Sequence, residues 1–197
     1  RQLKIIKFIL KTCEEFKLTV MAAEGTLLGA IRNNGFIPWD DDVDLMMPRN
    51  DYEILIKKII KNPSLEFHLW NENTDRKYHL TFIKFVANDS GPFENVIPKD
   101  IERKFSGPRL DIFPVDEIFY SENIIPKIQN FLISIFRKAL IAKRLKKLEG
   151  TFLKKLIIKL ISFWPYKVLH RLIKESAIFQ SNFIFKYLLI FKKNKSK

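Results

Sequence analysis

The densest group of acidic side chains in the chain consists of four aspartates within five residues: Asp40, Asp41, Asp42 and Asp44. Carboxylates this close together repel one another, and burying one without compensation costs free energy. If residues 42–45 form a strand, Asp42 and Asp44 point to one face, while Val43 and Leu45 point to a core. Two neighbouring carboxylates on a rigid strand suit a hard divalent cation such as Mg²⁺ or Mn²⁺.

A solvated acidic loop is the alternative interpretation, and an isolated Asp-x-Asp pair would favour it, because charged side chains are mostly exposed. The preceding residues favour the metal site instead. A turn at Gly25-Thr26 is followed by a predicted helix, and the first N–H groups of a helix can bind phosphate. Taken alone, this turn would be an ordinary connection between a strand and a helix.

Two blocks of sequence resemble a known family. Residues 25–52, GTLLGAIRNNGFIPWDDDVDLMMPRNDY, resemble the signature of the LicD family and, more loosely, of fukutin-related proteins. Residues 109–116, RLDIFPVD, resemble the second block of that family and supply a third carboxylate, Asp111. Two blocks in the right order make a specific match, which extends from about Leu3 to Asp116.

This resemblance implies a phosphotransferase with a nucleotidyltransferase-like fold. The expected reaction moves phosphocholine, or a similar phospho-alcohol, from a CDP-linked donor such as CDP-choline to a hydroxyl. The acceptor would belong to a cell-surface glycan or glycolipid: lipopolysaccharide, teichoic acid or capsule. The implied metal ligands and catalytic residues are Asp42, Asp44 and Asp111, and Mg²⁺ or Mn²⁺ is the implied cofactor.

Four further residues are expected to bind the donor phosphates: Gly25, Thr26, Arg32 and Lys84. Lys84 has a second interpretation, because a lysine between apolar neighbours can also extend its ammonium group to solvent. Trp39 precedes the acidic cluster and is expected to pack the loop, although an indole can also stack on a base. The polar residues 88–107 are expected to form a lid or acceptor loop.

Two other functions compete with the leading hypothesis. In the first, the same fold transfers the nucleotide itself to the acceptor. In the second, the chain is a noncatalytic basic protein that binds a membrane or nucleic acid, of which nucleic acid is the less favoured partner. The intact acidic constellation argues against the second alternative.

Composition supports a folded domain with an unequal distribution of charge. Hydrophobic residues make up 47% of 197 residues, and the net charge is +13. Residues 121–197 hold 18 basic and 3 acidic side chains, a net of +15, so residues 1–120 have a net of −2. The single cysteine excludes an internal disulfide and a cysteine-based zinc site. Any metal chemistry is therefore expected to rest on carboxylates.

The pattern of elements predicts an α+β fold: a small mixed sheet flanked by helices, followed by a basic helical extension. Strands are expected at 18–23, 42–47, 65–70, 78–86 and 110–113, and helices at 2–17, 26–31 and 52–61. Asn50 or Asp51 is expected to cap the helix at 52–61. The predicted domains are a catalytic core at 1–120 and an extension at 121–197.

The extension is predicted to form helices at 122–149, 151–164, 166–173 and 183–191, the first of them ending at Gly150. Basic amphipathic helices with aromatic residues can lie in a membrane interface, although each of these helices can also pack on the domain with its lysines in solvent. No apolar run reaches the length of about 20 residues that spans a bilayer. We therefore expect a cytoplasmic protein, with peripheral membrane contact through residues 121–197.

The first residue is not methionine, and the C-terminal block of full-length relatives is not visible, so we expect either a fragment or a chain with a processed start.

Overall fold

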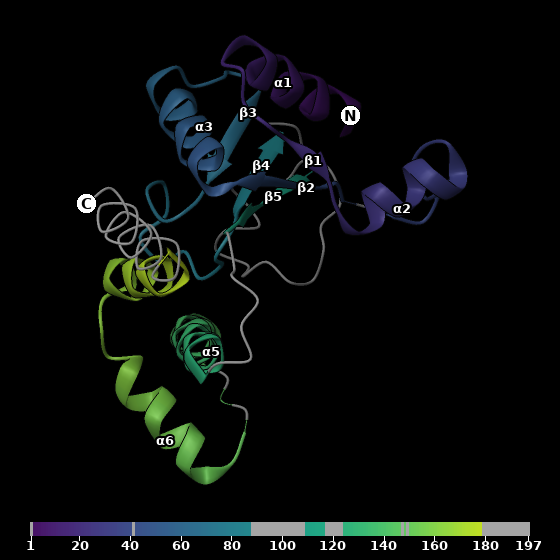
Figure 1. Ribbon diagram of the computed structural model, residues 1–197. Coiled ribbons are helices and arrows are strands. Elements are labelled where there is room, and N and C mark those ends of the chain that lie inside the picture. The colour runs from purple at the N-terminus through teal and green to yellow at the C-terminus, as the bar shows by residue number, and fades with distance from the viewer. Residues whose placement is uncertain are drawn as a thin grey trace, which may run out of the picture. The chain divides into compact units, whose positions relative to one another are not determined.

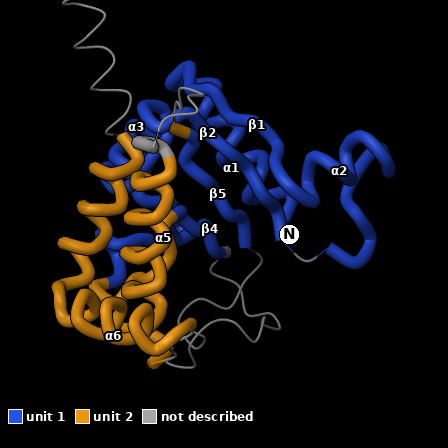
Figure 2. Tube along the Cα trace, turned by 60° about the horizontal axis from the view of Figure 1, so that its bottom comes forward, with its two compact units in different colours: residues 1–75, 82–115 blue, residues 76–81, 116–197 orange. Residues whose placement is uncertain are grey.

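The computed structural model describes residues 2–40, 42–87, 109–116, 124–146, 148 and 150–178. These residues divide into two compact units, shown in Figure 2. One unit comprises residues 1–75 and 82–115, and the other comprises residues 76–81 and 116–197. The predicted domain boundary at residue 120 lies outside the described residues.

The first unit is built on a five-stranded mixed sheet (Figure 1). Its strand order is β1-β2-β5-β4-β3, in which β2 and β5 are parallel and all other neighbours are antiparallel. The bounds are β1 Met21–Ala22, β2 Asp44–Pro48, β3 Phe67–Trp70, β4 Ile83–Ala87 and β5 Arg109–Val115. The small mixed sheet predicted from the sequence is therefore confirmed.

Three helices belong to this unit: α1 Gln2–Glu15, α2 Glu24–Asn33 and α3 Arg49–Lys61. Helices α1 and α3 contact the sheet and share one core with it. Each helix contributes apolar residues at helical spacing, and each central strand contributes alternate residues. The buried members of the core include Ile5, Ile9, Cys13, Val43, Leu45, Met47, Leu55, Ile59, Ile83, Phe85, Leu110 and Ile112.

The strand predicted just before the polar segment 88–107 begins later in the structure than in the prediction. The sequence predicts a strand at 78–86, but β4 begins at Ile83. Tyr78 and His79 are buried and belong to the second unit. There the carbonyl oxygen of Tyr78 lies 2.9 Å from Nε2 of His170, and the two rings stack 6.0 Å apart. Tyr78, one of the aromatic residues that suggested a strand, thus packs in the helical unit, whereas Phe85 lies in β4.

The second unit contains α5 Ile124–Leu145, α6 Phe152–Ile161 and a further helix at 166–178. Its separate core is formed by apolar residues of all three helices: Ala139, Leu140, Ala142, Ile158, Leu169 and Ile173. Helix α5 ends at Leu145, and Lys146 takes a left-handed φ of 55°, so Gly150 does not end it as predicted. The helix predicted at 183–191 and the segment 88–107 lie outside the described residues.

None of the described helices combines the length and the apolar character that a membrane span requires.

Candidate active site

One row of residues crosses the sheet on the face opposite the core. Asp44 of β2 pairs with Asp111 of β5, and Asp111 pairs with Lys84 of β4. Their neighbours along each strand, such as Leu45 and Ile112, belong to the core that α1 and α3 cover. Because side chains alternate across a strand, the three charged side chains share the other face. The sheet therefore brings together residues from three distant parts of the sequence.

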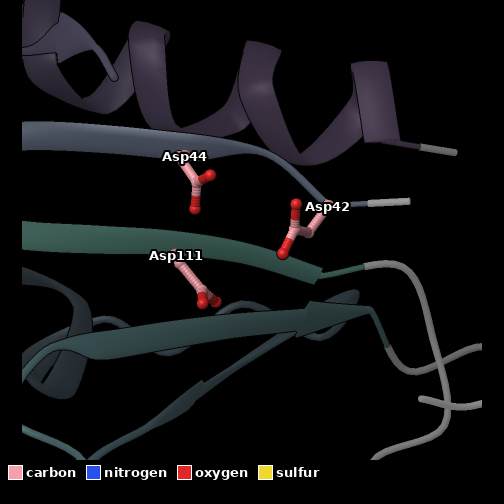
Figure 3. Close-up of side chains that lie close together, drawn as sticks. All are labelled: Asp42, Asp44 and Asp111. Atoms are coloured by element: carbon pink, nitrogen blue, oxygen red, sulfur yellow. The ribbon is translucent and has the colours of Figure 1, made fainter. Parts of the chain in front are cut away.

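Asp42 joins this row from just outside the sheet. It lies in a bend before β2, not in the strand as the alternation predicted. The N–H of Asp111 donates to the carbonyl of Val43 over 2.8 Å, so pairing with β5 begins one residue before β2. One carboxylate oxygen from each of Asp42, Asp44 and Asp111 lies within 4.8 Å of the others (Figure 3).

Lys84 and Asp111 form a buried ion pair. The ammonium Nζ of Lys84 donates to both carboxylate oxygens of Asp111, over 2.8 and 2.6 Å. The exposed fractions of the two side chains are 11% and 6%. Lys84 therefore does not extend to solvent, which rules out one of its two predicted roles. Its role in binding donor phosphate stays a prediction.

The crowded carboxylates perturb one another. Burial raises the pKa of Asp44 to about 7, and the charges of Asp42, Asp111 and Asp40 act in the same direction. Burial also raises the pKa of Asp111, while the ammonium group of Lys84 acts in the opposite direction. A carboxyl that is hard to ionise among other carboxylates, even near Lys84, indicates a site with more negative than positive charge.

The first turn of α2 is held against β2 by hydrogen bonds on both sides of Asp44's backbone. The hydroxyl of Thr26 accepts from the N–H of Asp44 over 2.8 Å. The N–H of Ala23 donates to the carbonyl of Asp44 over 3.0 Å. Thr26 therefore fixes the position of a carboxylate residue, a contact that the sequence did not predict.

Gly25 lies against the side chain of Asp40. A Cβ atom at position 25 would collide with Oδ2 of Asp40, so a larger residue there would require this carboxylate to move aside. A carboxylate of the chain itself thus lies at the turn where the sequence predicts a donor phosphate. The phosphate-binding roles of Gly25 and Thr26 stay predictions.

Arg32 is not brought to the carboxylates. It lies in the last turn of α2, seven residues beyond Gly25, which corresponds to about 10 Å along the helix axis. Its Nε donates to the side chain of the neighbouring Asn33 over 3.0 Å.

Trp39 was expected to pack, but 80% of it is exposed. Stacking of Trp39 on a ligand ring therefore stays a prediction.

The residues present fit a hard divalent cation. Three carboxylates offer oxygen ligands in one small volume, and the ammonium group of Lys84 binds Asp111. Oxygen-only ligand sets favour Mg²⁺ and Mn²⁺ over softer metals. The metal would be held by Asp42, Asp44 and Asp111.

Comparison with known proteins extends these observations. Residues 17–130 match the family described as LicD/FKTN/FKRP, nucleotidyltransferase domain. The chain is 30% identical over 129 residues to a protein of Haemophilus influenzae named lipopolysaccharide cholinephosphotransferase LicD. That alignment covers 62% of this chain and 44% of the relative, so the chain spans less than half of the relative's length. No solved structure gives a significant match.

The matched residues include the whole carboxylate site together with Gly25, Thr26, Arg32 and Lys84, and they make up more than half of the chain. The chain therefore belongs to the LicD/FKTN/FKRP family, with a nucleotidyltransferase-like domain.

Proposed function

We propose that this protein is a metal-dependent transferase that moves phosphocholine, or a similar phospho-alcohol, from a CDP-linked donor to a hydroxyl of a cell-surface glycan. One observation carries the proposal: the carboxylates of Asp42, Asp44 and Asp111 converge within a sequence that matches the family. The name of the Haemophilus relative, a cholinephosphotransferase, favours choline as the transferred alcohol.

The roles of the three aspartates and Lys84 follow from their charges and from the rigid strands that carry them. A divalent cation held by the three aspartates would neutralise the phosphates of the donor and stabilise charge that develops during transfer. Asp44 and Asp111 lie on paired strands, so their separation is fixed before the donor binds. Lys84 holds the Asp111 carboxylate in one orientation. Catalysis by such a site rests on positioning and electrostatics.

Donor binding and transfer are tested separately, because the chain spans only part of its relative. The first measurement is calorimetric titration of CDP-choline into the protein with Mg²⁺, and then with EDTA. We expect binding that requires the metal and is lost in Asp44→Asn. Glu14→Gln, an exposed acid on α1, is the matched control and should bind normally. Metal-independent binding that survives Asp44→Asn would contradict the proposed site.

The second measurement follows transfer to a lipopolysaccharide or teichoic acid acceptor by mass spectrometry. The proposal predicts that phosphocholine is added and that CMP is released. The family description as a nucleotidyltransferase domain favours one other product, an acceptor that carries the nucleotide itself. The two products differ in mass. Transfer that persists in a folded Asp42→Asn, Asp44→Asn double variant would refute both reactions at this site.

A further inference from the structure

Helix α6 exposes its apolar side chains to solvent. The exposed fractions are 85% for Phe152, 65% for Leu153, 45% for Leu156 and 60% for Leu160. At 3.6 residues per turn, these four positions fall within an arc of about 100°. The exposed face of the helix is therefore more apolar than chance exposure of single residues would give.

The turn after α6 extends this surface. Phe163 and Trp164 are 76% and 46% exposed. Their N–H groups donate to the carbonyls of Leu160 and Ile161 over 3.3 and 3.0 Å, which continues the helical path of the backbone. We call the six side chains the α6 apolar face: Phe152, Leu153, Leu156, Leu160, Phe163 and Trp164.

The opposite side of α6 is already used for folding. Ile158 is 3% exposed and belongs to the core of the second unit, and Ile161 packs against that core. Ile158 lies about 190° around the helix from the middle of the exposed arc. Among the described residues, the core of this unit therefore includes no side chain of the α6 apolar face.

The charge around this face has one sign. Between Gly150 and Lys174 the sequence has six basic residues and no acidic residue. Lys155 and Lys159, one turn apart and both exposed, border the apolar arc. An apolar stripe bordered by lysines, with a tryptophan at its end, matches the chemistry of an anionic lipid surface, which offers hydrocarbon below a layer of negative charge.

We infer that the second unit docks on an anionic bilayer through the α6 apolar face, with that face in the hydrocarbon boundary and Lys155 and Lys159 at the headgroups. Nucleic acid explains the lysines but not the row of leucines, because phosphate contacts come from basic and polar side chains. A second copy of the chain explains the leucines, but like charges would face each other across such a contact.

The test is flotation of the full chain with vesicles. We compare two kinds of vesicle: phosphatidylcholine with about a third phosphatidylglycerol, and pure phosphatidylcholine. The anionic lipid gives the first kind a strong negative surface potential. We expect binding to the anionic vesicles that weakens as salt rises, since screening shortens electrostatic attraction. Binding to the neutral vesicles should be much weaker.

Two variants test the apolar contact and the bordering lysines separately. Phe152→Ser with Phe163→Ser removes apolar contact, and we expect its partition coefficient to fall about tenfold or more. Lys155→Glu with Lys159→Glu reverses the bordering charge, and we expect a similar or larger fall. All four side chains are exposed, so both variants should fold.

Matched controls come from the first unit. Ile31 and Leu65 are 73% and 95% exposed apolar residues, and Ile31→Ser with Leu65→Ser should leave binding unchanged. Lys7 and Lys11 have the same four-residue spacing on α1, and Lys7→Glu with Lys11→Glu makes the same change in net charge. This control should lose far less binding than the change at Lys155 and Lys159.

Four outcomes would overturn the inference. Absence of binding to anionic vesicles is the first, and equal loss in the variants and their controls is the second. The third is a dimer in light scattering that dissociates in Phe152→Ser with Phe163→Ser, without vesicle binding by the original chain. Tight binding to a DNA duplex that ignores the phenylalanine changes, again without vesicle binding, would assign the basic surface to nucleic acid.

Discussion

The sheet unit and the helical unit distribute charge in opposite ways. In the sheet unit, Asp111 and Lys84 are buried, and Asp42 and Asp44 are half-buried beside them. In the helical unit, lysines lie in solvent beside exposed phenylalanine and leucine side chains. Buried charges need fixed partners, whereas exposed charges need only a surface of opposite sign. The first arrangement suits chemistry at one point, and the second suits adhesion to an extended surface.

The largest expected effect separates these two roles. Asp44→Asn should lower transfer by at least about 100-fold, because it removes one of the three carboxyl ligands from the site. The same change should leave vesicle flotation untouched, since Asp44 belongs to the sheet unit. The measurement pairs a transfer assay with flotation on one preparation. Equal losses in both assays would show that the two units do not act separately.

Removal of the buried ammonium group of Lys84 should lower the stability of the sheet unit. Lys84→Met leaves Asp111 without its partner beside two other carboxylates, and we expect the free energy of unfolding to fall by about 3 kcal/mol. Urea denaturation in EDTA measures this fall. Lys57→Met, at an exposed position of α3, is the control and should change stability by less than about 0.5 kcal/mol. A Lys84 variant as stable as this control would mean that the ion pair does not support the fold.

The two cores offer a matched pair of leucines. Leu110 in the sheet unit and Leu140 in the helical unit are both fully buried. Each change to alanine should cost about 2–5 kcal/mol, from lost apolar burial and the cavity that remains. If the units unfold separately, Leu140→Ala should lower the unfolding midpoint of the helical unit alone. Metal-dependent binding of CDP-choline should then be unchanged. One shared transition in both variants would contradict separate unfolding.

The smallest expected effect is a dependence of stability on pH. Asp44 has a pKa of about 7 in the folded protein and 3.8 as an ordinary side chain, so the folded state holds an extra proton between these values. The free energy of unfolding should therefore fall as pH rises from about 4 to about 7, and then level off. The change should be modest, because Asp44 is only half-buried. Denaturation in EDTA across this range should show a shallower slope for Asp44→Asn than for Glu14→Gln.

Much of the candidate site follows from local sequence. The alternation at Asp44-Leu45 and Leu110-Asp111-Ile112 predicts which face of each strand carries a carboxylate, because successive side chains in a strand point in opposite directions. The basic amphipathic pattern of residues 152–164 likewise predicts a helix with a charged border. These features need only the geometry of one element.

Long-range contacts were decided by the tertiary structure. The Lys84–Asp111 pair joins residues 27 positions apart and depends on the register of β4 against β5, which neither strand encodes alone. The sequence predicts Asn50 or Asp51 as the cap of α3, but Pro48 occupies the cap position and both residues lie inside the helix. The carboxylate of Asp51 instead accepts from the N–H of Thr19 over 2.7 Å. Residues 76–81 joined the helical unit because Tyr78 is buried there beside His170.

The residue types, the faces they share along each element and the family resemblance all follow from the amino-acid sequence alone. The tertiary structure decided which charges meet: it paired Lys84 with Asp111, placed Asp40 against Gly25 and left Arg32 at the far end of α2. The physical reason is that periodicity is a property of one element, whereas electrostatic partners depend on how separate elements are packed and registered.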